Sequence, residues 1–185
     1  MLLNVEQAQR MLEQADLLCP REQVDAAIEQ LAQKLCKDFR GRQPLLLCVM
    51  NGAVYFCGKL LPLLDFPLHL DYVHASRYGD HLNGQQIQWK VAPPPYVKDR
   101  AVLVLDDILD EGLTLAAIKD QVLALGARSC EVAVLADKQT GRPKPVRADY
   151  VGLQVPDRFV FGCGLDAYGS WRNLPAIYAL KEHKV

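Results

Sequence analysis

One strongly apolar segment near the middle of the chain is followed by three aspartates, a glutamate, a glycine and a threonine. Residues 101–105 are all apolar, Asp106 and Asp107 follow directly, and Asp110 comes after two further apolar residues. A buried carboxylate costs free energy unless a cation or hydrogen-bond donors compensate it. Carboxylate oxygens are also ligands that Mg²⁺ prefers. The spacing therefore predicts a site for a phosphorylated ligand together with a metal ion.

The turn at residues 110–114 has the composition of a phosphate-binding loop. Gly112 permits close approach of the backbone, and N–H groups at the start of the following helix attract an anion. Thr114 adds a hydroxyl donor, but the lysine of the GxxxxGK[ST] loop is missing. This segment alone leaves open the alternative that solvated acids cap an ordinary helix.

Residues on both sides of these motifs predict a parallel sheet covered by helices. Continuous apolar runs at 44–50 and 101–105 and the mostly apolar segment 129–136 are typical of buried parallel strands, and helical patterns follow the first two. Right-handed crossovers then bring the strands into one α/β sheet. Polar residues lie at the carboxyl ends of these strands, where ligands bind in such sheets. We therefore expect Asn51-Gly52, residues 106–114 and residues 137–138 to form one composite site.

The other segments predict helices, shorter strands and a loop. The predicted helices are residues 5–15 and 21–38, and the shorter strands are 68–75, 87–91, 150–155, 159–161 and 177–180. Residues 76–86 are polar and contain glycine, and long polar loops in compact domains are often lids. We therefore expect a lid over about 76–90, including Ser76, Arg77 and Tyr78.

Composition limits the function classes. The chain has 185 residues, a length typical of one domain, and we expect residues 1–185 to form a single one. A net charge of −1 without a basic run argues against nucleic-acid binding. Residues 1–10 lack the features of a signal peptide, and the apolar runs are too short to span a membrane. The six cysteines form no CxxC pair and predict buried thiols in a reducing cytoplasm.

The segment 102–114 resembles the phosphoribosyl-pyrophosphate-binding motif of type I phosphoribosyltransferases, in which an apolar strand, two acids and two apolar residues precede Asp-x-Gly-x-Thr. Nearly the whole chain is similar to hypoxanthine-guanine phosphoribosyltransferases. The supporting segments are 49–53, 76–79, 137–138 and 151–160, with Gly162 and Leu165-Asp166. The resemblance implies a helix-flanked parallel core, a flexible lid, and a small hood formed by about residues 150–185 with the N-terminal segment.

The implied activity belongs to purine salvage. The enzyme would transfer the 5-phosphoribosyl group from phosphoribosyl pyrophosphate to N9 of hypoxanthine or guanine, giving IMP or GMP and pyrophosphate. It would require Mg²⁺, two ions in all, and no organic cofactor, because phosphoribosyl pyrophosphate is a co-substrate. The resemblance also implies a cytoplasmic homodimer or homotetramer that acts on small molecules.

Five residues would contact the purine base. Asp110 would lie near N7 as general base or as stabiliser of the proton there, and Lys138 would donate to O6. Phe159 would stack on the base, Val160 would contact its edge through the backbone, and Asp166 would also bind the base. Two alternatives remain at this point, in which Lys138 is an exposed residue at a strand end and Phe159 packs in the core.

The remaining residues would hold the sugar diphosphate. Asp106 and Asp107 would bind ribose hydroxyls and metal-bound water, Asp166 would bind a second Mg²⁺, and Arg172 and Asn51-Gly52 would bind pyrophosphate. The 5′-phosphate would contact Asp110, Glu111, Gly112, Leu113 and Thr114.

Three positions depart from the pattern of some relatives. Asn51 and Leu113 stand where some carry lysine, and Arg77 occupies a lid position where a smaller or different residue is common. A backbone-mediated pyrophosphate site would lose little at Asn51, whereas Leu113 removes a charge near the phosphate. Arg77 either contacts pyrophosphate or is a solvated loop residue.

Two other function classes compete with the enzyme. A non-catalytic regulator could keep the phosphate turn and lose the base-binding residues, but Lys138, Phe159 and Asp166 are all present. A phosphoacceptor receiver domain also uses paired acids and a later lysine. Its acids lie on the first strand, whereas Asp106 and Asp107 lie in the middle of this chain.

Overall fold

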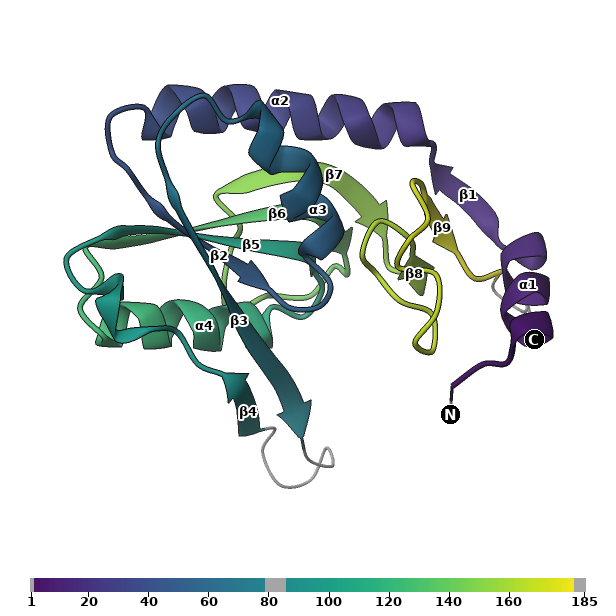
Figure 1. Cartoon of the computed structure of the whole chain (residues 1–185). Helices are drawn as coiled ribbons and strands as arrows, with labels where there is room; N and C mark the ends of the chain where they lie inside the picture. The colour runs from purple at the N-terminus through teal and green to yellow at the C-terminus, as the bar shows by residue number, and fades with distance from the viewer. Residues whose placement is uncertain (1, 79–85, 182–185) are drawn as a thin grey trace.

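A six-stranded sheet with helices on both faces forms the centre of the molecule (Figure 1). The computed structural model describes residues 2–78 and 86–181. In spatial order the strands are β4 (Gln86–Val91), β3 (His69–Tyr78), β2 (Leu45–Val49), β5 (Ala101–Leu109), β6 (Ser129–Gln139) and β7 (Tyr150–Pro156). All neighbours pair in parallel except β4, which is antiparallel to β3. Apolar β2 is buried along its whole length, as both faces of the sheet are covered.

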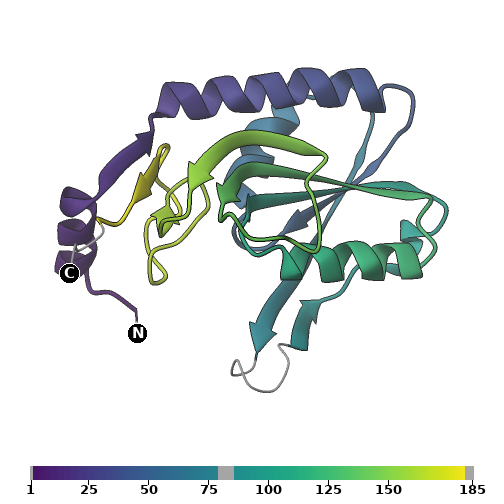
Figure 2. The same cartoon turned by 180° about the vertical axis from the view of Figure 1, so that it is seen from behind.

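Helices α2 (Arg21–Phe39) and α3 (Val54–Leu60) cover one face of this sheet, and α4 (Leu113–Ala124) covers the other (Figures 1 and 2). The apolar positions of α2 recur at helical spacing and are buried. Helix α1 (Val5–Gln14) lies apart from the sheet and begins with an Asn4 capping box. Two short 3₁₀ helices, η1 (Leu61–Leu63) and η2 (Pro95–Val97), complete the helical structure among the described residues.

A second, antiparallel sheet lies beyond the carboxyl ends of β5, β6 and β7 (Figure 2). It consists of β1 (Asp16–Cys19), β9 (Ile177–Ala179) and β8 (Val160–Phe161), in that order. Arg158 strengthens it, since its Nη2 donates to Oδ2 of Asp16 at 2.6 Å and to the Leu180 oxygen at 2.8 Å. An early strand, β1, therefore pairs with a late one, β9, beyond the carboxyl ends of the larger sheet.

The predicted α/β class is confirmed, but the strand expected over residues 101–105 is longer than predicted. Asp106 and Asp107 lie within β5, which continues to Leu109. The ladder with β6 continues through Asp106↔Val134 to Leu109↔Asp137, so backbone pairing carries the strand past the first polar residues. The acids are consequently fixed by the sheet and not by a turn.

Three other boundaries differ from the sequence prediction. Residues 76–78 and 86–90, expected in the lid, belong to β3 and β4, because Tyr78 pairs with Gln86. The rest of the predicted lid, 79–85, lies outside the described residues. The expected hood started near residue 150, yet β7 pairs with β6 in the larger sheet. Strand β1 lies between the helices predicted at 5–15 and 21–38, where no strand was expected, and it is stabilised by its pairing with β9.

The six cysteines are free thiols, five of them buried and Cys36 partly buried. Burial of these small apolar side chains agrees with their positions in apolar segments. Within residues 2–78 and 86–181, no helix combines the length and apolarity needed to cross a bilayer.

Candidate active site

One cavity of about 360 Å³ lies where β2, β5 and β6 end and the second sheet begins. Its lining residues are Val49, Met50, Asn51, Gly52, Asp106, Asp107, Ile108, Asp110, Lys138, Phe159, Val160, Leu165, Asp166 and Arg172. The predicted convergence of strand ends therefore brings together the residues expected to contact the base, the ribose and the pyrophosphate. Residues 111–114 of the predicted phosphate turn adjoin this cavity in sequence without lining it.

The loop after β2 packs directly against the acids of β5. It begins with a cis peptide bond between Met50 and Asn51. A Cβ added at Gly52 would overlap Oδ2 of Asp107 and lie 2.5 Å from its Cγ, so this position has room only for glycine. A Cβ at Gly164 would likewise overlap the backbone oxygen of Gly52. These close approaches hold the loop, the acids and the segment after β8 together.

The two acids of β5 are deeply placed in this cavity. Asp106 is only 8% exposed, and its Oδ1 accepts a hydrogen bond from the backbone N–H of Asp107 at 2.9 Å. Burial raises the pKa of both carboxyls, and the neighbouring Asp107 raises the pKa of Asp106 further. Buried Asp106 and partly buried Asp107, side by side, are stabilised by a cation, and their hard oxygen donors fit Mg²⁺.

No cluster of three or more histidine, cysteine, aspartate or glutamate side chains suited to a metal ion exists in the described part of the chain. Asp106 and Asp107 offer carboxylates only. Mg²⁺ in proteins commonly uses one or two carboxylates, several waters and the phosphates of a substrate. The donor set therefore fits a metal ion that arrives with a phosphorylated ligand.

Asp110 and Lys138 form an ion pair at the edge of the cavity. Nζ of Lys138 donates to Oδ2 of Asp110 at 2.6 Å. The side chain of Lys138 is 12% exposed, which disfavours the alternative of a solvated lysine at a strand end. Sequence reasoning expected both residues near the base but missed the pair itself. A donor and an acceptor side by side match the adjacent O6 and N7–H of a 6-oxopurine.

Phe159 lies at the surface and stacks on another aromatic ring. It is 45% exposed, so the core-packing alternative is wrong for this residue. Its ring stacks on Tyr168, with centroids 5.6 Å apart and planes 12° from parallel. Tyr168 was missed, although an aromatic residue in a glycine-rich segment is a usable signal. The following Val160 is buried in β8.

Arg172 is held in place by the segment that follows β8. Its Nη1 donates to the Gly164 oxygen at 2.6 Å and its Nη2 to Oδ1 of Asp166 at 2.5 Å. The other carboxylate oxygen of Asp166 accepts from the Gly169 N–H at 2.8 Å. The guanidinium is 39% exposed, so the remaining N–H donors can reach an anion in the cavity.

The predicted phosphate turn leads into α4 as expected. Gly112 has a φ of +81°, which favours glycine, and precedes the first helical residue, Leu113. The turn thus presents the N-terminus of a 12-residue helix, which attracts a phosphate. Of the predicted lid residues, Ser76, Arg77 and Tyr78 lie in β3.

The family model and the similar sequences all point to phosphoribosyltransferases. A family model described as "Phosphoribosyl transferase domain" matches residues 20–168. A hypoxanthine-guanine phosphoribosyltransferase of Streptococcus thermophilus is 35% identical over 167 residues, 90% of this chain and 93% of that protein. The enzyme of the same name from Bacillus subtilis is 32% identical over 166 residues, 89% of this chain and 92% of that protein.

Solved structures of similar proteins have the same fold. A hypoxanthine-guanine phosphoribosyltransferase from Bacillus anthracis superposes with a TM-score of 0.81 at 29% identity, covering 90% of this chain and 97% of that one. A hypoxanthine phosphoribosyltransferase from Trypanosoma cruzi, in a ternary complex with substrates, gives a TM-score of 0.83 at 29% identity, with coverage of 91% and 97%.

Proposed function

Because the chain belongs to the hypoxanthine-guanine phosphoribosyltransferases, glycosyltransferases of purine salvage that use phosphoribosyl pyrophosphate, we propose that it converts hypoxanthine or guanine to IMP or GMP. One observation supports this most strongly. The Asp110–Lys138 pair shares a cavity with the exposed Phe159 ring and the acids of β5. A base and a sugar diphosphate can therefore meet at the carboxyl edge of the sheet.

The base is held by its edge and by its face. Lys138 donates a hydrogen bond to O6. The Asp110 carboxylate either accepts a hydrogen bond from N7–H or takes up that proton as general base. The Phe159 ring stacks on the purine, which takes the place of the Tyr168 ring. The backbone of Val160 contacts the Watson–Crick edge. Asp166, which lines the same cavity, also binds the base.

The sugar diphosphate occupies the rest of the cavity. Asp106 and Asp107 bind the ribose hydroxyls and, directly or through water, Mg²⁺, and Asp166 contacts a second ion. When bound, Mg²⁺ neutralises charge on the pyrophosphate leaving group. Asn51-Gly52 and Arg172 bind that pyrophosphate. The 5′-phosphate is cradled by Asp110, Glu111, Gly112, Leu113 and Thr114.

The reaction follows from this placement. Purine N9 attacks C1 of the ribose with inversion as the bond to pyrophosphate breaks and C1 gains oxocarbenium character. The enzyme contributes positioning and electrostatic stabilisation of the leaving group, and no covalent nucleophile is needed.

The wider setting of the enzyme is also part of the proposal. Residues 1–185 form a single phosphoribosyltransferase domain, and the protein is a cytoplasmic homodimer or homotetramer. Size-exclusion chromatography with light scattering measures the oligomeric state directly, and a monomer at assay concentration would contradict it.

A pyrophosphate-release assay tests the proposed activity. We expect release with phosphoribosyl pyrophosphate, Mg²⁺ and hypoxanthine or guanine, and none when EDTA removes the divalent cation. Xanthine in a parallel reaction establishes whether the third 6-oxopurine is used. Release that persists in EDTA would contradict the metal requirement. A regulator that only binds the sugar diphosphate would show binding by calorimetry without release.

Replacing Lys138 by methionine is expected to relax the choice of base. The change removes the donor to O6 and leaves a side chain of similar length, so kcat/KM for hypoxanthine should fall about 10- to 100-fold. The ratio of kcat/KM for hypoxanthine over adenine should narrow as well. Steady-state kinetics with both bases measures this, and Lys34→Met, at an exposed position of α2, is the matched control. An unchanged ratio in Lys138→Met would remove Lys138 from base recognition.

A further inference from the structure

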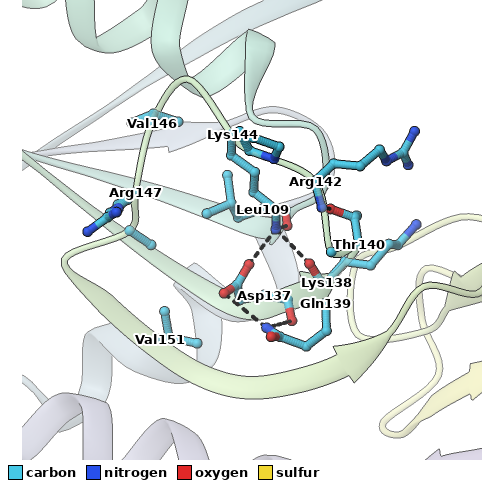
Figure 3. A pocket seen from close by; sticks show the side chains of 13 residues that line it. Leu109, Asp137, Lys138, Gln139, Thr140, Arg142, Lys144, Val146, Arg147 and Val151 are labelled. Carbon is cyan, nitrogen blue, oxygen red and sulfur yellow. Dashed lines mark hydrogen bonds and ion pairs between the residues drawn. The ribbon is translucent and has the colours of Figure 1, made fainter.

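A lysine outside the candidate active site, Lys144, is held by three hydrogen bonds in the loop 140–149 (Figure 3). Its Nζ donates to the backbone oxygens of Leu109 at 2.8 Å and Lys138 at 2.6 Å, and to Oδ1 of Asp137 at 2.6 Å. An ammonium group has three N–H donors, and all three are used here. The side chain is only 14% exposed. The loop thus places a largely buried cation on two main-chain carbonyls.

These two carbonyls flank the ion pair of the active site. The Leu109 carbonyl immediately precedes Asp110, and the Lys138 carbonyl belongs to its ion-pair partner. The ladder between β5 and β6 ends at Leu109↔Asp137, so no strand pairing fixes Asp110 relative to β6 beyond that point. Lys144 supplies a cross-link between the two strands where the ladder stops.

The residues after Lys144 also support the phosphate turn. Val146 is only 8% exposed. A Cβ added at Gly112 would lie 3.2 Å from Cγ1 of Val146 and 3.5 Å from Cδ of Pro145, so the loop packs closely beneath the turn. The loop therefore contacts the back of the site through Lys144 and through this apolar packing.

We infer that Lys144 is a positioning residue for the transfer reaction: it sets the distance between the Asp110 carboxylate and the Lys138 ammonium and hence their fit to N7 and O6 of the base. This inference rests on the proposed function. Lys144 does not line the cavity that would hold the substrates, and it acts through the strand ends that carry the two contacting side chains.

The test is a kinetic comparison of Lys144→Met with the wild type. We expect kcat/KM for hypoxanthine to fall about 10- to 100-fold, since misplacement of catalytic groups by an ångström has effects of that size. The KM for phosphoribosyl pyrophosphate should change less, because Val146 and Pro145 remain. Lys144→Arg should recover part of the loss, since it keeps the charge and donors but replaces a tetrahedral ammonium by a planar fork.

Arg147→Met is the matched control. Arg147 lines the same cavity as Lys144 in Figure 3, is exposed, and has no hydrogen bond or ion pair with the described residues. We expect its kinetic constants to equal those of the wild type. Circular dichroism and thermal melting confirm that each variant is folded. If Lys144→Met does not fold, Lys144→Arg carries the test, with an intermediate kcat/KM as the expected result.

A double-mutant cycle separates positioning from general stability. In an Asp110→Asn background, Lys144→Met should add little further loss, because Asp110 is already impaired. Two results would overturn the inference about Lys144 and leave the proposed function standing, provided that the wild type is active. One is a fully additive loss of kcat/KM in the double variant, and the other is a wild-type kcat/KM in folded Lys144→Met. A wild type without turnover would instead overturn the proposed function on which it depends.

Discussion

Asp110→Asn is expected to lower kcat about 10²- to 10⁴-fold while leaving the fold intact. The carboxylate at the end of β5 accepts a hydrogen bond from Lys138 at 2.6 Å and faces the cavity proposed for the base. Asparagine keeps the size and one acceptor oxygen but can neither take up a proton from N7 nor balance a positive charge there. Steady-state kinetics with hypoxanthine and saturating phosphoribosyl pyrophosphate measures the loss.

Stability provides the control for Asp110→Asn. Asp110 is 41% exposed, so the ion pair with Lys138 contributes little, and we expect the free energy of unfolding to change by less than about 1 kcal/mol. Asp120→Asn, on the exposed part of α4, is a matched change of charge away from the cavity. Turnover in Asp110→Asn equal to that of the wild type would remove Asp110 from the reacting site.

The second large effect is expected from Gly52→Ala. The added Cβ would overlap Oδ2 of Asp107, so this carboxylate must leave its position in the cavity. Asp107 is proposed to bind ribose hydroxyls and metal-bound water, and its displacement should lower kcat/KM for phosphoribosyl pyrophosphate by about 10²-fold. Calorimetric titration with phosphoribosyl pyrophosphate and Mg²⁺ should show weaker binding as well.

Gly58→Ala is the control for this change. Gly58 lies in α3, and a Cβ there meets no atom within 4 Å. We expect unchanged activity and a gain in stability of up to about 1 kcal/mol, because alanine is a better helix former than glycine. If Gly52→Ala bound and used phosphoribosyl pyrophosphate like the wild type, the close approach to Asp107 would have no functional meaning.

Local sequence pattern predicts much of this fold because the local signals agree with the long-range structure. Mostly apolar segments predict β2, β5 and β6, since strands covered on both faces carry apolar residues on both faces. Strand β1 could not be found in this way. It has four residues, and it is stabilised by pairing with β9, more than 150 residues later in the chain.

The difference between local sequence patterns and long-range contacts also decides which site residues could be predicted. Asp106 and Asp110 stand out because acids after an apolar run are costly unless they bind something. The pair that Asp110 forms with Lys138 depends on the register of β5 and β6, which no single-sequence pattern contains. Lys144 lies in a loop of ordinary composition, and only the folded chain shows that its three donors are all used.

Identification of the product by mass spectrometry and NMR tests whether one composite site binds a 6-oxopurine and phosphoribosyl pyrophosphate and joins them at N9. Incubation of the wild type with phosphoribosyl pyrophosphate, Mg²⁺ and hypoxanthine should give IMP with the ribose on N9, whereas adenine should give no AMP. Absence of a nucleotide with every 6-oxopurine, or formation of AMP at the rate of IMP, would contradict the account.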